Sequence, residues 1–253
     1  MPNILSWNIN GFRSILKNGY WDEVLAKQYD IICFQEAKLS EVQILREVVP
    51  EEYHIYVNFS KEKGRNGVIV LSKKRPETVI YTLGHEQFDK EGRYIKLLYK
   101  DFTLINLYMP HGRRDKSQLG YKLEVAEVLE KELKQLLYKN VIVATDFNIA
   151  ANEIDVCRAE QNYKNIMFTD AERQVVRFIC KMGYKDAFRE IYRDKVGYTW
   201  WTYAFNCREK NVGWRIDYFF VTESVLNRIE EVEILKEQKG SDHCPIMIRI
   251  KGK

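Results

Sequence analysis

The sequence predicts an α/β or α+β fold, with strands in the majority and helices placed between them. Short runs of apolar and β-branched residues, each long enough for a buried strand, recur along the whole chain and alternate with amphipathic segments. Apolar residues make up 45% of the 253 residues, which supports a sizeable core. Because no Gly/Ser/Pro-rich linker divides the chain, we expect a single domain over residues 1–253.

Strands are expected wherever an apolar run is bounded by turn residues. The Asn-Gly pair at the end of loop 63–67 has the composition of a hairpin turn, and Lys100-Asp101 forms a tight turn between two strands. The expected strands are residues 2–8, 31–36, 53–59, 67–72, 77–82, 93–99, 102–108, 141–145, 215–221 and 245–250.

Four helices are expected from apolar residues at three- and four-residue spacing and from capping residues. A short amphipathic helix spans about residues 21–28, and the longest helix runs from Leu119 to about Lys139. Ser40 with Gln43, and Thr169 with Glu172, have the pattern of a capping box. These boxes predict one helix that ends before Pro50 and one that ends at Gly183.

The run 141–145 is followed abruptly by Asp146 and Asn148. If the extended geometry persists, the side chains of these two residues project together, because a strand alternates faces. A carboxylate and a carboxamide at the end of a buried strand are costly unless a metal, a water or a substrate satisfies them. The alternative is an ordinary turn or helix cap, where Asp and Asn are common.

The same arrangement recurs at other apolar runs. Each of five further runs carries a polar, chemically competent residue at one end: Asn8, Glu36, Tyr108, Asp217 and the Asp242-His243 pair. Polar residues at the ends of strands can converge on a single cleft, which is where binding sites are commonly built. We therefore expect one site assembled from both ends of the chain.

Seven motifs give a family resemblance that spans nearly the whole chain. They are SWNINGFRS (6–14), QEAKL (35–39), FDKEGR (88–93), NLYMP (106–110), DFN (146–148), NVGWRIDYFFV (211–221) and GSDHCPI (240–246). In this order and spacing, the sequence resembles the exonuclease III / AP endonuclease family, the DNA-repair branch of the endonuclease/exonuclease/phosphatase superfamily. The resemblance implies a four-layer αββα sandwich of two packed, mainly antiparallel sheets with helices outside.

The resemblance also implies the activity and its partners. It implies a Mg²⁺-dependent phosphodiesterase that incises DNA 5′ to abasic sites and has 3′→5′ exonuclease or 3′-end trimming activity. Mn²⁺ is expected to substitute for Mg²⁺, and the partner is double-stranded DNA with abasic sites or blocked 3′ ends. Two alternatives remain: a superfamily phosphoesterase acting on a phospholipid head group or phosphoinositide, and a catalytically inactive nucleic-acid-binding scaffold.

A hard divalent cation such as Mg²⁺ prefers one or two carboxylates together with substrate oxygens. Glu36 is the best candidate metal ligand because it follows a buried apolar run; the alternative is a salt bridge with Lys38. Asp242 is the second candidate ligand. Asn8 is a candidate neighbour of the metal or the phosphate.

The family match implies roles for five catalytic residues. His243 contacts the scissile phosphate and pairs with Asp217, and this carboxylate raises the pKa of the imidazole. Asp146 orients or deprotonates the attacking water, Asn148 holds the phosphate or that water, and Tyr108 hydrogen-bonds the phosphate. His243 acts either as an imidazolium that stabilises the transition state or as a neutral base, and the sequence does not separate the two.

Trp200, Trp214 and Ile216 match the family's apolar pocket for a flipped-out, baseless deoxyribose. The alternative for these residues is a core aromatic cluster, which is the expectation for Trp201 and Tyr203. Arg65 and Arg113 are candidate DNA-grasping residues that position the duplex without reading its sequence. Together with Lys116 they are expected to make DNA binding weaken with salt, although the formal net charge of the chain is a modest +4.

Four departures from the family pattern lie near the expected site. His111 stands where members usually have Asn or Gln, which alters phosphate contact or adds pH sensitivity. Thr145 replaces a Gly, and Asn10 stands where some members have Asp, so a metal role for Asn10 is doubtful. The pair 166–167 replaces a small Ala-Gly pair and enlarges an apolar wedge near the lesion.

The cysteines and the distribution of apolar residues indicate the compartment. The five cysteines form no C-x-x-C pair, and their odd number does not fit a disulfide framework. This indicates a reducing, intracellular setting, either the cytoplasm and nucleoid or a nucleus. No signal peptide and no stretch of about 20 apolar residues is present, so we expect neither secretion nor a membrane partner. We expect a monomer.

Overall fold

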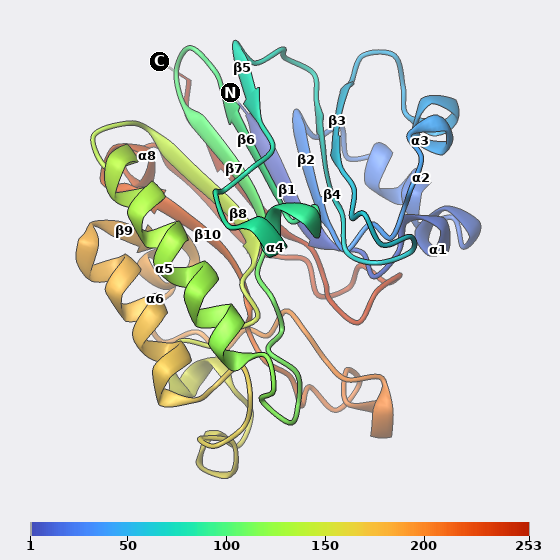
Figure 1. Ribbon diagram of the computed structural model, residues 1–253. Helices are drawn as coiled ribbons and strands as arrows, with labels where there is room; N and C mark the ends of the chain where they lie inside the picture. The colour runs from blue at the N-terminus through green and yellow to red at the C-terminus, as the bar shows by residue number, and fades with distance from the viewer. Residues whose placement is uncertain (1, 253) are drawn as a thin grey trace.

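The computed structural model describes residues 2–252, which form two six-stranded sheets packed face to face with helices on their outer faces (Figure 1). The first sheet contains, in spatial order, β11 (Ile229–Ile234), β12 (Ile246–Ile250), β1 (Asn3–Asn8), β2 (Ile31–Gln35), β4 (Val68–Ser72) and β3 (His54–Asn58). The second contains β5 (Thr78–Ile80), β6 (Tyr94–Leu98), β7 (Thr103–Tyr108), β8 (Val141–Asp146), β10 (Asp217–Thr222) and β9 (Tyr184–Asp186). The predicted four-layer sandwich is confirmed.

Each sheet is mainly antiparallel with one parallel pair near its centre. Over residues 2–252, the parallel pairs are β1 with β2 and β7 with β8, and the other eight strand pairings are antiparallel. Parallel strands end at the same edge of a sheet. Asn8 therefore lies opposite Gln35, and Tyr108 lies opposite Asp146.

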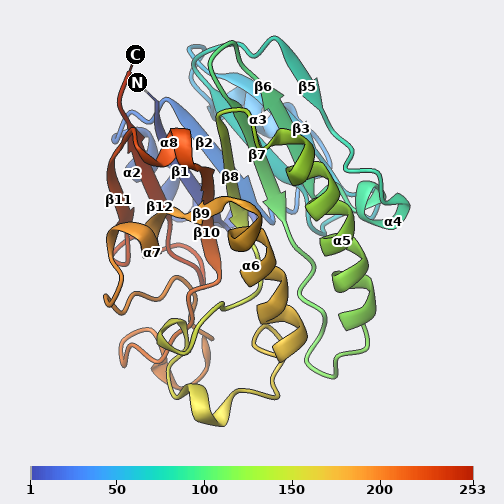
Figure 2. The same cartoon turned by 90° about the vertical axis from the view of Figure 1, so that its left-hand side faces the viewer.

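The helices lie on the two outer faces. Three short helices accompany the first sheet: α1 (Phe12–Lys17), α2 (Tyr20–Leu25) and α3 (Gln43–Val48). The two longest, α5 (Leu119–Leu136) and α6 (Asp170–Met182), lie side by side over the second sheet (Figure 2). The remaining helices are α4 (Glu86–Lys90), α7 (Ala187–Ile191) and α8 (Glu223–Leu226), with 3₁₀ turns at Glu153–Asp155, Ala159–Gln161 and Ala204–Asn206.

Apolar side chains fill three layers. The central layer, between the sheets, includes Ile4, Leu104 and Phe219. One outer layer packs α5 and α6 against the second sheet, and the other packs α1 to α3 against the first. Because strand residues alternate faces, each central strand supplies both the inner layer and one outer layer, so its apolar run is nearly continuous.

Most expected elements are present, with a few differences. Thr169 and Glu172 form the predicted capping box, and Gly183 caps the end of α6. The box at Ser40 is wrong: α3 begins at Gln43 after Val42, whose backbone is already helical, and no side chain caps it. Two strands were not expected: β9 is only three residues long, and β11 carries three glutamates in six residues.

Among residues 2–252, no helix combines the length and the apolar character needed to cross a membrane.

Candidate active site

The predicted convergence of strand ends is visible as hydrogen bonds between the two sheets. The side-chain amide of Asn8, at the end of β1, donates to Oδ2 of Asp146 at 2.8 Å and to Oε2 of Glu36 at 3.1 Å. Asn8 and Asp146 are both almost fully buried and belong to different sheets. The Asn8 carboxamide thus joins Asp146, a catalytic candidate, to Glu36, a metal-binding candidate.

Asp146 and Asn148 lie together as predicted, but the backbone does not stay extended. Asn148 has a φ of 52°, so the chain turns directly after β8. The backbone N–H of Asn148 donates to Oδ1 of Asp146 at 3.0 Å, and its side-chain amide donates to Oδ2 at 3.2 Å and to the carbonyl of Met109 at 3.0 Å. The turn brings the amide back over the carboxylate.

His243 lies between two carboxylates. Its Nδ1 is 2.9 Å from Oδ2 of Asp217, and its Nε2 is 3.8 Å from Oδ2 of Asp146. Asp217 begins β10 directly opposite Asp146 in β8, while His243 precedes β12 of the other sheet. The ligand atoms of all three residues lie within 4.8 Å of one another.

Burial and charge set the protonation states of this trio. Burial alone would lower the pKa of His243, but the carboxylates of Asp217 and Asp146 outweigh it and raise that pKa to about 10. Burial raises the pKa of Asp146, while the neighbouring imidazolium opposes the rise. An imidazolium has no lone pair left for a metal, so His243 in this state is a hydrogen-bond donor.

Tyr108 ends β7 beside Asp146 and is held from one side by Arg93 of the FDKEGR motif. The guanidinium carbon of Arg93 is 4.4 Å from the centroid of the Tyr108 ring, and Nη1 donates to the Tyr108 carbonyl at 3.3 Å. Burial, with the charges of Glu36 and Asp146, raises the pKa of Tyr108 well above its usual value despite Arg93. The phenol is therefore neutral near pH 7 and able to donate a proton.

Glu36 and Asp242, the carboxylates predicted to hold a metal, are linked through the side chains of Lys38 and Asn10. The Lys38 ammonium lies 3.2 Å from Oε1 of Glu36 and also donates to Oδ1 of Asn10, whose amide in turn donates to Asp242 at 2.9 Å. A positive charge thus already bridges the region between the Glu36 and Asp242 carboxylates. Carboxylate and amide oxygens are the donors that Mg²⁺ and Mn²⁺ prefer. The salt bridge of Glu36 with Lys38, raised as an alternative, is also present.

The predicted apolar pocket residues lie together, and one of them, Trp200, contacts Asp242. Trp200, Trp214 and Ile216 pack in one cluster with Phe168 and Met167. The rings of Trp200 and Trp214 meet edge to face, with centroids 6.4 Å apart. Nε1 of Trp200 donates to Oδ2 of Asp242 at 3.0 Å, so the wall of this cluster is bonded to the polar site. The cluster is buried core on one side and site wall on the other.

The predicted DNA-binding cations lie on exposed loops around this edge, and the structure brings none of them into the buried cluster. Arg65 is mostly exposed and pairs with Glu62 of its own loop at 3.0 Å. That loop is bonded to the segment after Glu36, through Lys38 N–H to the Asn66 carbonyl at 2.8 Å. His111, Arg113 and Lys116 are exposed on the loop that follows β7.

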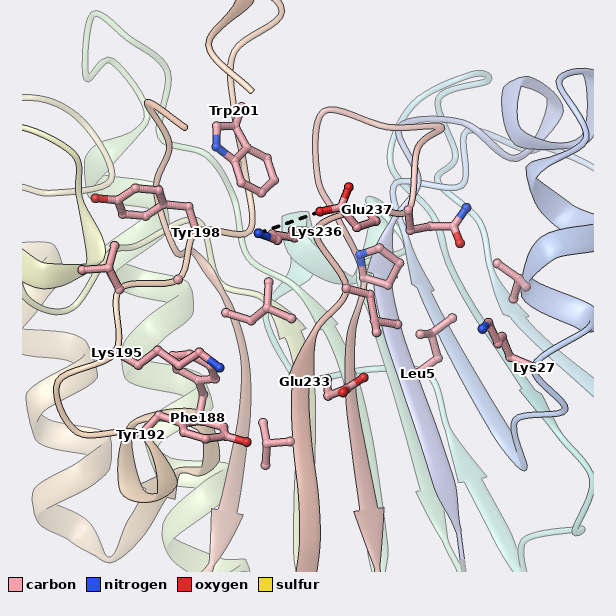
Figure 3. A pocket seen from close by; sticks show the side chains of 18 of the residues that line it. Leu5, Lys27, Phe188, Tyr192, Lys195, Tyr198, Trp201, Glu233, Lys236 and Glu237 are labelled. Atoms are coloured by element: carbon pink, nitrogen blue, oxygen red, sulfur yellow. Dashed lines mark ion pairs between the residues drawn. The ribbon is translucent and has the colours of Figure 1, made fainter. Parts of the chain in front are cut away.

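Sequence reasoning misplaced Tyr203 and missed two further features next to the site. Trp201 is buried as expected, but the core position expected for Tyr203 is wrong: Tyr203 and Phe205 project from the loop after Trp201 and are 72% and 85% exposed. The backbone N–H of Trp201 donates to the Asp242 carbonyl at 3.0 Å, so this loop begins at the rim of the site. Trp201 also borders a separate cavity of about 670 Å³, which Figure 3 shows beside β11 with Phe188, Tyr192 and Lys236 on its walls. The mostly polar run 206–211 after Phe205 indicates an exposed loop, and this was the signal available in the sequence.

A buried imidazolium between carboxylates, a neutral phenol and further carboxylates at the same edge suit hydrolysis of a phosphoester. Residues 5–243 match the model of the Endonuclease/Exonuclease/phosphatase family, and the chain belongs to this family.

Within it, the chain is similar to DNA-repair nucleases. It is 38% identical to the exodeoxyribonuclease of Bacillus subtilis over 98% of both chains. It is 37% identical to the DNA repair nuclease APEX1 of Danio rerio, over 97% of this chain and 81% of that protein. An AP endonuclease structure from Archaeoglobus fulgidus matches all of both chains with a TM-score of 0.87 at 27% identity. The protein is a hydrolase of the nuclease type, and the resemblance to the exonuclease III / AP endonuclease family is confirmed.

Proposed function

We propose that this protein is a DNA-repair phosphodiesterase that uses Mg²⁺, incises DNA 5′ to abasic sites and trims blocked 3′ ends. The observation that carries the proposal is the bond from Trp200 to Asp242, because it joins an apolar cluster able to receive a sugar without a base to the cation site. A sugar lacking its base is inexpensive to extrude from a duplex. The names of the relatives, exodeoxyribonuclease, DNA repair nuclease and AP endonuclease, support the same substrate class.

The metal has a defined place in this proposal. Glu36 and Asp242 would hold Mg²⁺, with Asn8 fixing Glu36 through its hydrogen bond. When bound, the ion would neutralise charge on the phosphate and orient it.

The protein's own residues supply the other requirements of hydrolysis. Asp146 is buried and accepts three hydrogen bonds from Asn8 and Asn148, which aim its carboxylate at an attacking water and orient that water. His243 donates to a phosphate oxygen as charge develops there, and Asp217 holds its ring in place. The raised pKa of His243 favours this role over that of a neutral base. Tyr108 donates a further hydrogen bond to the phosphate.

The proposal also covers the DNA-binding residues, the domain organisation, the oligomeric state and the location of the protein. Arg65, Arg113 and Lys116 contact DNA phosphates, and His111 lines the approach. We further propose that residues 1–253 form one catalytic domain, because one site draws Asn8 and His243 from opposite ends of the chain. It acts as a monomer inside the cell, which the five unpaired cysteines support.

The test is cleavage of a labelled duplex that carries one reduced abasic analogue, with Mg²⁺, with Mn²⁺ and with EDTA. The reduced analogue excludes β-elimination, so incision reports hydrolysis. We expect incision immediately 5′ to the analogue with either metal, none with EDTA, and none in the same duplex without the lesion. The variant His243→Ala serves as the inactive control.

Two other outcomes would contradict the proposal in different ways. Degradation from 3′ ends without incision would contradict the proposed abasic pocket and would still support metal-dependent hydrolysis. If the protein neither incises the abasic duplex nor degrades DNA from 3′ ends, a lipid phosphoester substrate or an inactive scaffold would be favoured.

A further inference from the structure

One of the ion pairs that the catalytic scheme does not use is fully buried between the two longest helices. Lys122 of α5 and Glu172 of α6 lie 2.6 Å apart, and neither side chain has any exposed surface. Both helices begin at the edge of the second sheet that carries the site, as Figure 2 shows. Burying two charges costs several kcal/mol per ion, and a pair of apolar residues commonly stabilises a core as well or better. The pair therefore needs an explanation other than stability.

We propose that Lys122 and Glu172 are positioning residues that hold the catalytic amide of Asn148 and the floor of the sugar pocket, formed by Met167 of the apolar cluster, in a fixed relation. The proposal rests on the function proposed above. It extends that function by assigning the alignment of pocket and catalytic group to a buried pair that touches neither substrate nor metal.

The Lys122 ammonium is bonded to the backbone of two site loops. Its Nζ donates to the carbonyl of Asn148 at 2.6 Å and to the carbonyl of His111 at 3.3 Å, in addition to Glu172. Three donors on one nitrogen thereby meet three acceptors on different segments. Asn148 is the residue whose side chain bonds Asp146, so Lys122 acts on the catalytic carboxylate through one intervening residue.

The Glu172 carboxylate holds a third loop, which carries the pocket floor. Oε1 accepts the N–H of Met167 at 3.0 Å as well as the Lys122 ammonium. Oε2 accepts the N–H and hydroxyl of Thr169 at 3.1 and 2.7 Å. Met167 belongs to the apolar cluster with Trp200, and its carbonyl accepts the N–H of Ala150 at 2.8 Å. These bonds close a ring from Asn148 through Lys122, Glu172 and Met167 to Ala150.

Backbone strain at two members of the ring shows why such support is needed. Asn148 and Met167 have φ values of 52° and 70°, in the left-handed region that favours glycine. Non-glycine residues in this region cost of order 1–3 kcal/mol and persist when their surroundings hold them. Each of the two strained residues makes a direct backbone hydrogen bond to one member of the ion pair. An apolar pair would fill the same volume but could not make these directional bonds.

The test separates positioning from stability by two changes of opposite character. The double variant Lys122→Met/Glu172→Leu replaces the pair with apolar residues, which keeps the core filled and removes the four backbone contacts of the pair, to His111, Asn148, Met167 and Thr169. The variant Glu172→Gln keeps an acceptor for Met167 and for Lys122 but destroys the charge balance of the pair. Thermal unfolding, kcat and KM on the abasic duplex are measured for both.

We expect turnover to depend on the backbone bonds of the pair and not on stability alone. The apolar double variant should unfold at a lower temperature, because it leaves the N–H groups of Met167 and Thr169 without their acceptor. At a temperature where it is folded, it should lose at least tenfold in kcat, with a smaller change in KM. Glu172→Gln should unfold at a lower temperature and keep kcat within about threefold at a temperature where it is folded. The matched control is Lys96→Met/Glu132→Leu, which removes the ion pair between β6 and α5 and should leave kcat within about twofold.

A folded apolar double variant with wild-type kcat would overturn the proposal. So would a Glu172→Gln variant that loses as much kcat as the double variant. If the apolar variant does not fold, Lys122→Met/Glu172→Gln replaces it, since it differs from Glu172→Gln only in the loss of the Lys122 ammonium, the donor to the carbonyls of Asn148 and His111. Equal kcat in those two would also overturn the proposal.

The experiments distinguish an error in the proposed abasic function from an error in the proposed role of Lys122 and Glu172. Wild-type protein that trims a 3′-phosphate end but does not incise abasic DNA contradicts the abasic function. The pair is then tested on the 3′-phosphate substrate, because Asn148 and Asp146 serve hydrolysis of either substrate.

Discussion

Replacing Asp146 by Asn tests the catalytic assignment with the smallest change of shape. The carboxylate lies 3.8 Å from Nε2 of His243 and is fully buried. At an effective dielectric constant of about 20, two unit charges at this separation interact by about 4 kcal/mol. The amide removes this interaction and also places an N–H₂ group against the donors of Asn8 or Asn148.

If the whole interaction between Asp146 and His243 stabilises the transition state, its loss of about 4 kcal/mol lowers kcat by a factor of about 10³. DNA affinity should be unchanged or higher, because a negative charge leaves a cleft that binds phosphate. Single-turnover cleavage of the abasic duplex and fluorescence anisotropy of the same DNA measure the two effects. Asp101→Asn, at the opposite end of β7 from Tyr108, makes the same change of charge away from the site.

A kcat for Asp146→Asn within tenfold of wild type would refute the reasoning. So would a loss of DNA affinity combined with normal turnover of the bound DNA, since the residue would then act in binding. A tenfold loss in Asp101→Asn would show that net charge, and not the position of Asp146, sets the rate.

Three further predictions follow from other parts of the structure. Phe205→Ala should weaken DNA binding about tenfold at unchanged Tm, because this ring is 85% exposed and base stacking contributes about 1–3 kcal/mol. DNA affinity is measured by fluorescence anisotropy, and an unchanged affinity would contradict the prediction. Arg65→Ala should make the plot of log affinity against log salt shallower by about one, and an unaltered slope would exclude a phosphate contact. Asp155 has its pKa lowered, against the effect of burial, by Arg215 at 2.7 Å. Its contribution to stability is therefore present above about pH 4 and lost as pH falls further, so Tm in wild type should drop more steeply there than in Asp155→Asn. Parallel Tm profiles below pH 4 would contradict this.

The convergence of strand ends could be predicted because it depends on one local property. A buried apolar run that ends in a polar residue is visible in sequence, and Asn8, Asp146 and Asp217 each follow or begin such a run. The contact between Asp146 and Asn148 was predicted for the wrong reason. It depends on a left-handed turn at Asn148, and no periodicity reveals a single φ value.

Other features depend on tertiary surroundings. Lys122 lies three residues after Leu119 and four before Ala126, on the buried face of α5, but a lysine on a helix usually indicates the solvated face. Its carboxylate partner comes from another helix 50 residues away, so spacing alone cannot identify the pair. β11 was missed because its glutamates mask the apolar alternation, as is common in an edge strand.

The relation of the two sheets is fixed by polar groups directly behind the site. Gln35, at the end of β2, donates to Oδ1 of Asn106 in β7 at 2.8 Å, and Asn106 donates to the carbonyls of Phe34 and Ile69 at 3.1 and 2.9 Å. Gln35 and Asn106 have no exposed surface, and apolar layers alone would permit the sheets to slide. A slide would separate Asn8 from Asp146, because these residues belong to different sheets. The buried amides therefore fix the register on which the bond between Asn8 and Asp146, and with it the catalytic cluster, depends.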